Sequence, residues 1–181
     1  MDINNSADKQ LLLIHPIGVG LSARFWDRFV ACWQTTETPA VLLAPDLLGC
    51  GTAACPARPL TPEDWAEPLI NLIQERKSGP TVLVVQGASL PIALAFAAKA
   101  PELVSALVAI SPPGWMVLNK EFAQSKARLI WRFLFEGPIG NLFYRYARRR
   151  AFLDSFSRKN LFARAEAVDD EWLEMLKEGS L

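Results

Sequence analysis

The sequence lacks net charge, because nineteen lysines and arginines balance nineteen aspartates and glutamates among its 181 residues. The total therefore indicates neither a nucleic acid nor an acidic ligand. Cysteine is scarce and odd in number, and Cys32, Cys50 and Cys55 match no metal-ligand spacing. We expect reduced thiols and no bound metal.

The chain also lacks a recognisable secretion signal and a membrane span. Its start, residues 1–5, does not follow the basic then apolar plan of a signal peptide. The longest nearly apolar run, residues 81–98, contains Gln86, Gly87, Ser89 and Pro91, which suits a strand, a turn and a helix better than a bilayer span. We expect a protein that is cytoplasmic, at most peripheral to a membrane, and not secreted.

What the sequence does contain is a regular alternation of strand and helix patterns. About half of the residues are hydrophobic, enough for one globular domain with a core. Short apolar runs predict strands near residues 11–14, 40–44, 81–86 and 105–110, with 81–86 central. Helical patterns cover 22–33, with Ser22 as N-cap, 61–76 and 92–100. This alternation predicts an α/β fold, a parallel sheet with helices on both faces.

Three loop motifs follow these strands in order: His15-Pro16-Ile17-Gly18, Asp46-Leu47-Leu48-Gly49-Cys50-Gly51, and Gly87-Ala88-Ser89-Leu90-Pro91. Together they resemble the H-G-x-G oxyanion loop, the D-x-x-G-x-G segment and the G-x-S-x-G nucleophile elbow of the α/β-hydrolase family. The resemblance implies a hydrolase-like core over residues 1–114 and a helical cap over 115–181. It further implies an esterase-like lineage, similar to capped cyanobacterial and plastid members, and no cofactor.

The elbow motif admits two registers. Read as G-x-S-x-G, it makes Ser89 the catalytic nucleophile, with Pro91 in place of the last glycine. Aligning Pro80 and Pro101 with the prolines that bracket this pattern in the family instead places Gly87 where the serine stands. The second register favours a chain without a nucleophile.

The oxyanion loop departs from the family pattern, and no catalytic base is evident in the sequence. The resemblance assigns His15, Ile17 and Gly18 to the oxyanion loop, but Pro16 replaces a glycine and removes one N–H donor. His15 either shapes this loop or simply hydrogen-bonds it to its neighbours. No histidine follows it, although serine hydrolysis needs a base. We therefore expect a chain that stops inside the cap, before the strands that carry the family's acid and histidine.

A dinucleotide site is the alternative interpretation of the first loop. Residues 18–23 fit the pattern G-x-G-x-x-A, follow a strand and open a helix. Asp46 would then be the acid that binds the ribose. The match is loose, because His15-Pro16-Ile17 separates the strand from the first glycine.

Basic and aromatic residues alternate from Lys126 to Arg164. This pattern suits an anionic membrane surface, the lid of an apolar site, a protein partner, or a solvated cap whose apolar face packs on the sheet. No nucleic-acid motif accompanies it, so we expect no nucleic acid. The candidate binding residues are Arg145, Arg148, Arg149, Arg150, Trp131, Phe143 and Tyr146. Acidic residues follow, and Asp169 or Asp170 is expected to cap a last helix with Trp172, Leu173 and Leu176 inward.

Two classes of function fit these patterns. One is a non-catalytic hydrolase-fold protein that binds an apolar ligand or ester, a membrane surface or a protein partner. The other is a serine ester hydrolase that uses Ser89 together with an acid and a histidine on sequence outside this chain. Its substrates, by resemblance, would be esters with long apolar tails.

Overall fold

Four parallel strands form one sheet in the order β2-β1-β3-β4. A computed structural model describes residues 9–77, 79–114 and 138–180. The strands are β1 (Lys9–Ile14), β2 (Ala40–Leu43), β3 (Thr81–Gln86) and β4 (Val104–Ile110). The predicted α/β fold with a parallel sheet is confirmed, and β3 lies inside the sheet.

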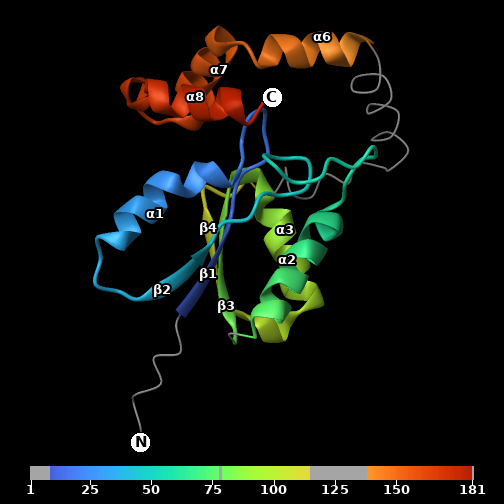
Figure 1. The fold of residues 1–181 in the computed structure, drawn as a ribbon, viewed down its shortest axis with the longest axis vertical. Coiled ribbons are helices and arrows are strands. Elements are labelled where there is room, and N and C mark those ends of the chain that lie inside the picture. Colours follow the sequence, from blue (N-terminus) through green and yellow to red (C-terminus); the bar gives the residue numbers. More distant parts are fainter. Residues whose placement is uncertain (1–8, 78, 115–137, 181) are drawn as a thin grey trace, which may run out of the picture.

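Helices cover both faces of the sheet (Figure 1). A short 3-10 turn, η1 (Ala23–Trp26), leads into α1 (Asp27–Gln34) on one face. On the other face lie α2 (Pro62–Arg76) and α3 (Leu90–Lys99), and a 3-10 turn, η3 (Pro101–Leu103), precedes β4. Ser22 stands at the N-cap position of η1, as predicted, but its side chain makes no cap hydrogen bond.

The continuous apolar runs of β1 and β3 are explained by burial on both faces. Leu12 and Ile14 of β1 belong to the cluster formed with α2 and α3, whereas Leu11 and Leu13 belong to the cluster formed with α1. Successive residues of a strand point to opposite faces, so an interior strand needs apolar residues at every position. Among the described residues, Phe96 of α3 is the largest fully buried side chain.

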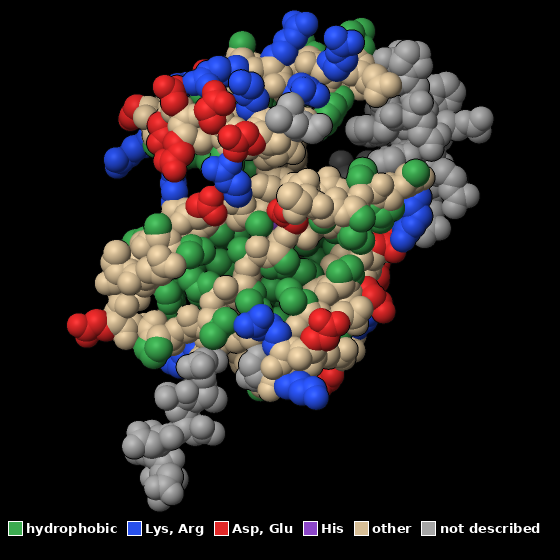
Figure 2. Space-filling model, viewed as in Figure 1, with side chains coloured by type: hydrophobic (Ala, Val, Ile, Leu, Met, Phe, Trp, Pro, Cys, Tyr) green, Lys and Arg blue, Asp and Glu red, His purple; other side chains and the backbone are tan. Residues whose placement is uncertain are grey.

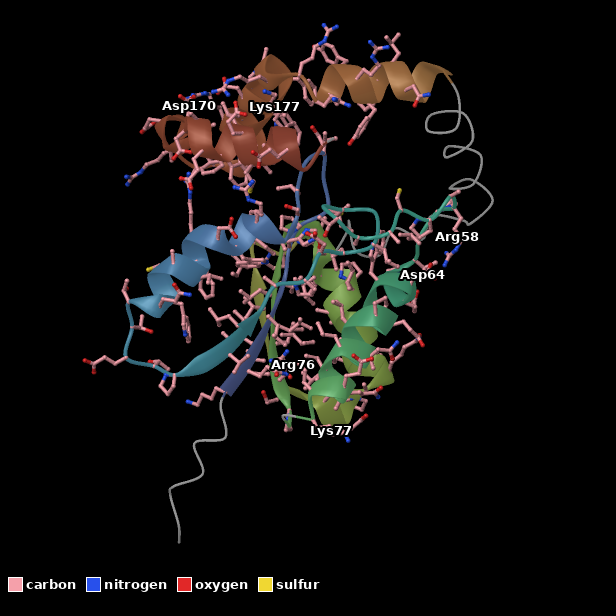
Figure 3. All side chains as sticks on the ribbon, viewed as in Figure 1. Arg58, Asp64, Arg76, Lys77, Asp170 and Lys177 are labelled. Carbon is pink, nitrogen blue, oxygen red and sulfur yellow. The ribbon has the colours of Figure 1, made fainter. Side chains whose placement is uncertain are left out.

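Local sequence fixes the start of α2. Thr61 accepts a hydrogen bond from the Asp64 N–H, and the Asp64 carboxylate accepts one from the Thr61 N–H, which forms a capping box. Arg58 adds a bidentate pair to the same carboxylate, with Nη1 to Oδ2 at 2.8 Å and Nη2 to Oδ1 at 2.6 Å (Figure 3). The predicted helix start at this threonine is confirmed.

The C-terminal helices form a separate layer across the end of the sheet where the strands finish (Figure 1). They are α6 (Pro138–Ala147), α7 (Arg150–Phe156), the π-helical turn η4 (Ser157–Leu161), the 3-10 turn η5 (Ala165–Ala167) and α8 (Asp170–Glu178). Asp169 caps α8 and Trp172, Leu173 and Leu176 are buried, as predicted. Within the described ranges, no helix is long and apolar enough to cross a bilayer.

The loop between β1 and η1 holds this layer in place. Leu21 joins a hydrophobic cluster with Leu153 of α7 and Leu176 of α8. At the surface, Arg28 Nη2 lies 2.6 Å from Asp169 Oδ1, and Arg24 pairs with Glu178. Exposed ion pairs of this kind contribute little each, so the cluster supplies most of the stabilisation.

Backbone contact completes the docking. Gly20 has φ +76°, and a Cβ atom at this position would lie 1.9 Å from the Leu176 carbonyl oxygen. A Cβ atom at Gly179 would lie 2.3 Å from the Gly20 carbonyl oxygen. The two glycines therefore let the end of α8 touch the loop directly, which no larger residue permits.

We expect Gly20→Ala to loosen α8, and Gly79→Ala provides the matched control. Both glycines have positive φ, but a Cβ atom at Gly79 meets nothing within 4 Å. Gly79→Ala should cost about 1 kcal/mol of unfolding free energy from backbone strain alone. Gly20→Ala should cost about 3 kcal/mol or more, because it adds a collision with α8.

Chemical denaturation measures both costs, and hydrogen exchange of residues 170–178 reports the docking of α8. Equal costs for the two variants, with unchanged exchange in α8, would show that the glycine contact does not hold the layer.

Candidate functional site

A cavity of about 550 Å³ lies between the loops at the carboxyl ends of the strands and the C-terminal helices. The β1–η1 loop contributes Pro16 and residues 17–19 and 21, and the end of β3 contributes residues 86–88. From the other side come Phe143 and Ala147 of α6, and residues of α7, η4 and α8. Most of these side chains are apolar, which is typical of small-molecule sites.

A second cavity of about 230 Å³ shares part of this wall. Pro16, Leu21, Gln86 and Leu161 line both spaces. Its remaining wall includes aromatic side chains and Arg28. The guanidinium of Arg28 is already paired with Asp169, and this pairing raises the pKa of Arg28 above its ordinary value.

Gly87 occupies the sharp turn between β3 and α3. The 3-10 turn η2 (Gly87–Ser89) joins the two elements, and Gly87 has φ +61°. In the G-x-S-x-G elbow the serine sits on a strained strand-to-helix turn of this kind. Here residue 87 carries the strained conformation and lines the cavity, and a Cβ atom there would meet nothing within 4 Å. The turn therefore presents a glycine to the cavity at the position where a nucleophile would stand.

Ser89, the predicted nucleophile, lies elsewhere. Its side chain is fully buried, and its hydroxyl donates to the His15 carbonyl oxygen at 2.9 Å. This bond ties the start of α3 to the end of β1. The cavity wall next to it is made by Gly87 and Ala88. A catalytic role for Ser89 stays a prediction that this geometry does not favour.

His15 is buried, and both ring nitrogens are engaged. Nδ1–H donates to the Pro16 carbonyl oxygen at 2.9 Å, and Nε2 accepts from the Leu47 N–H at 3.1 Å. Burial holds the pKa of His15 below its ordinary value. The ring thus joins two loops as a neutral group, whereas Ile17 and Gly18 of the predicted oxyanion loop do line the cavity.

Asp46 organises the loop after β2. Its carboxylate accepts from the Ala23 N–H at 2.8 Å, the Thr52 N–H at 2.8 Å and the Thr52 hydroxyl at 3.0 Å. Burial raises the pKa of Asp46, but these hydrogen bonds outweigh it and the net pKa is lowered. A Cβ atom at Gly51 would collide with this carboxylate. The Asp46 carboxylate is therefore occupied by hydrogen bonds within the protein. The dinucleotide interpretation is left without the acidic residue that would bind the ribose.

The predicted binding residues of the cap fall into separate groups. Phe143 lines the cavity, and Tyr146 contacts the Phe152 ring edge-on at 5.4 Å between centroids. Arg150 pairs with Glu174 at 2.6 Å and with Asp170. Arg145, Arg148 and Arg149 form no ion pair within the described part of the chain, and Trp131 lies outside it.

Several residues of the cavity wall were missed by sequence reasoning. Gln86, Ser111 and Asn160 supply polar groups there. Gln86 was detectable as the last residue of the central strand. Asn160 and Leu161 lie on the π-helical turn η4, and no local sequence pattern predicted this turn.

The buried cysteine is not poised to react, and the described part of the chain holds no metal-binding cluster. Burial raises the pKa of the Cys50 thiol to about 11, so a thiolate there is disfavoured near neutral pH. Over residues 9–77, 79–114 and 138–180, no cluster of three histidine, cysteine, aspartate or glutamate side chains is placed to hold a metal ion.

Comparisons with known proteins agree on the fold. A sequence model described as the Alpha/beta hydrolase family matches residues 11–180. Among solved structures, Cfl2 from Burkholderia cenocepacia superposes with a TM-score of 0.69 at 20% identity, covering 96% of this chain and 58% of that one. No curated protein matches the sequence significantly.

Two further structures carry enzyme names. Epoxide hydrolase VrEH1 from Vigna radiata has a TM-score of 0.67 at 18% identity, covering 95% of this chain and 59% of that one. A structure from a study of carboxylesterases in the thaumarchaeon Nitrososphaera gargenis has a TM-score of 0.61 at 18% identity, covering 96% and 58%. The chain therefore spans less than two thirds of these relatives. Its resemblance to cyanobacterial and plastid members stays a prediction.

Burial of neutral His15 predicts a pH dependence of stability. The folded pKa lies below the unfolded value near 6.5, so the unfolded state binds more protons as the pH falls through this window. Stability should be constant above about pH 7 and should fall below about pH 6.5, by at most roughly 1.4 kcal/mol per pH unit.

Denaturant unfolding between pH 8 and 5 measures this slope. His15→Asn is the control, since asparagine can donate and accept but does not titrate. The variant should lose the slope in this range. A slope that persists in His15→Asn would assign it to other groups.

Proposed function

The chain belongs to the alpha/beta hydrolase family, and we propose that it binds an apolar small molecule in its cavity without serine catalysis. The observation that carries this proposal is the pairing of an apolar cavity with Gly87 at the strained turn. Binding needs the cavity, but acyl transfer also needs a nucleophile and a base. The described residues form the cavity, but they offer no exposed serine at the elbow.

The cavity's size and lining define the class of ligand. A volume of about 550 Å³ falls within the range of small-molecule sites. Its walls are mainly aliphatic and aromatic, while Gln86, Ser111 and Asn160 offer a few polar groups. This composition supports a ligand with a long apolar part and one or two hydrogen-bonding groups, such as a fatty acid or its ester.

A serine ester hydrolase is the second candidate. The family and the enzyme names of its structural relatives favour it, and the missing acid and histidine would lie on sequence outside this chain. It also requires Ser89 to leave a buried hydrogen bond with His15 and to reach the cavity beyond Gly87. Leaving an acceptor unpaired in a buried site costs about 1–3 kcal/mol. We therefore prefer the binding protein.

A dansyl-labelled undecanoic acid provides a direct test of the cavity. Its emission should increase and shift to the blue when it is titrated with the protein. Ala147→Phe adds a phenyl ring at the cavity wall and should displace an apolar segment of the ligand. The loss of this segment's burial should weaken binding at least tenfold.

Ala151→Phe is the matched control, because it makes the same change at an exposed position of α7. It should bind as the unaltered protein does. Circular dichroism should show the same helix content in all three proteins. Equal affinities for the two variants, or no binding by the unaltered protein, would place the probe elsewhere and refute the cavity as a ligand site.

A further inference from the structure

Helix α6 presents two different faces. On the inner side Ala147 is buried, and the Tyr144 hydroxyl donates to the Ser180 carbonyl oxygen at 3.1 Å. Phe143 lines the cavity and is 57% exposed. Leu142 and Tyr146, four residues apart and therefore on one side of the helix, are 70% and 51% exposed. An exposed leucine beside an exposed tyrosine leaves an apolar strip on the outside of the C-terminal layer.

Unpaired basic residues border this strip. Arg145, Arg148 and Arg149 form no ion pair with any residue that the structure describes, and the Arg149 guanidinium carbon lies 5.8 Å from the centre of the Tyr146 ring. The neighbouring arginines differ, since Arg150 pairs with Glu174 and Arg158 pairs with Asp154 at 2.8 Å. Figure 2 shows lysine and arginine side chains gathered on the outer surface above α6 and α7.

We propose that the outer face of α6 together with the turn that follows it, made of Leu142, Arg145, Tyr146, Arg148 and Arg149, docks the protein on an anionic membrane surface. Apolar side chains can enter the boundary between headgroups and acyl chains, while guanidinium groups stay at the level of the phosphates. Charge complementarity selects anionic lipid, because these three arginines have no acidic partner in the described part of the chain. Leu142 is the most exposed large apolar side chain described, and it gains free energy from burial in a bilayer.

This orientation would bring the cavity to the membrane. Phe143 follows Leu142 in the sequence and forms part of the cavity wall, so the docked helix separates the lipid from the cavity by its own width. Membrane docking does not require a ligand in the cavity, so the vesicle experiment tests it independently of the proposed function.

Co-sedimentation of the full chain with vesicles tests the proposal. Binding to an equimolar mixture of phosphatidylserine and phosphatidylcholine should exceed binding to phosphatidylcholine alone, and salt should weaken it. The triple variant Arg145→Gln, Arg148→Gln, Arg149→Gln should bind the anionic vesicles about a hundredfold more weakly. Leu142→Ser should weaken binding about tenfold.

A charge-matched control lies at the other end of the molecule. Lys9→Gln, Arg76→Gln, Lys77→Gln removes the same charge where β1 begins and α2 ends, and Figure 3 places Arg76 and Lys77 far from the C-terminal layer. The control variant should retain at least half of the charge-dependent part of the free energy of vesicle binding. Circular dichroism should show that all variants are folded.

The proposal would be overturned by equal binding to both kinds of vesicle, by binding to neither, or by equal losses in the triple variant and its control. Binding to a labelled single-stranded RNA in the absence of vesicle binding would assign the face to nucleic acid and overturn it as well.

Discussion

The direct backbone contact between Gly20 and the end of α8 is the constraint on which the rest of the structure depends. A Cβ atom at Gly20 would collide with the Leu176 carbonyl group, so only glycine allows the C-terminal layer to approach the sheet this closely. The apolar cluster around Leu21, Trp172 and Leu176 then becomes buried. The cavity exists because this layer is held across the loops at the carboxyl ends of the strands.

The same loops determine what the cavity can do chemically. His15 joins the first loop to the second as a neutral ring, and Asp46 fixes the second loop through three hydrogen bonds. Ser89 holds the third loop to the first. The polar side chains of the three loop motifs, His15, Asp46 and Ser89, therefore position the backbone. Gly87 is the residue of the elbow that has a positive φ and lines the cavity. As a glycine, it carries no reactive group.

The sequence was informative wherever the structure is locally determined. Leu11–Ile14 is apolar at every position because β1 is buried on both faces, and Thr61 with Asp64 carries a complete capping box. The cavity was harder to predict, because it is formed by side chains from distant segments such as Pro16, Phe143 and Leu161. Arg150 differs from the other predicted binding arginines because it forms ion pairs with Asp170 and Glu174. No pattern in the sequence shows which arginine will form such a pair. The elbow was ambiguous because the motif selects Ser89, whereas the backbone conformation selects Gly87.

Intact mass spectrometry with a long-chain alkyl fluorophosphonate most directly tests whether the cavity holds an apolar molecule without serine chemistry. The reagent has an apolar tail that suits the cavity and a phosphorus centre that traps an activated serine. Our account predicts an adduct under native conditions that disappears when the protein is denatured, with the same result for Ser89→Ala. An adduct that survives denaturation in the unaltered protein and is missing in Ser89→Ala would contradict it.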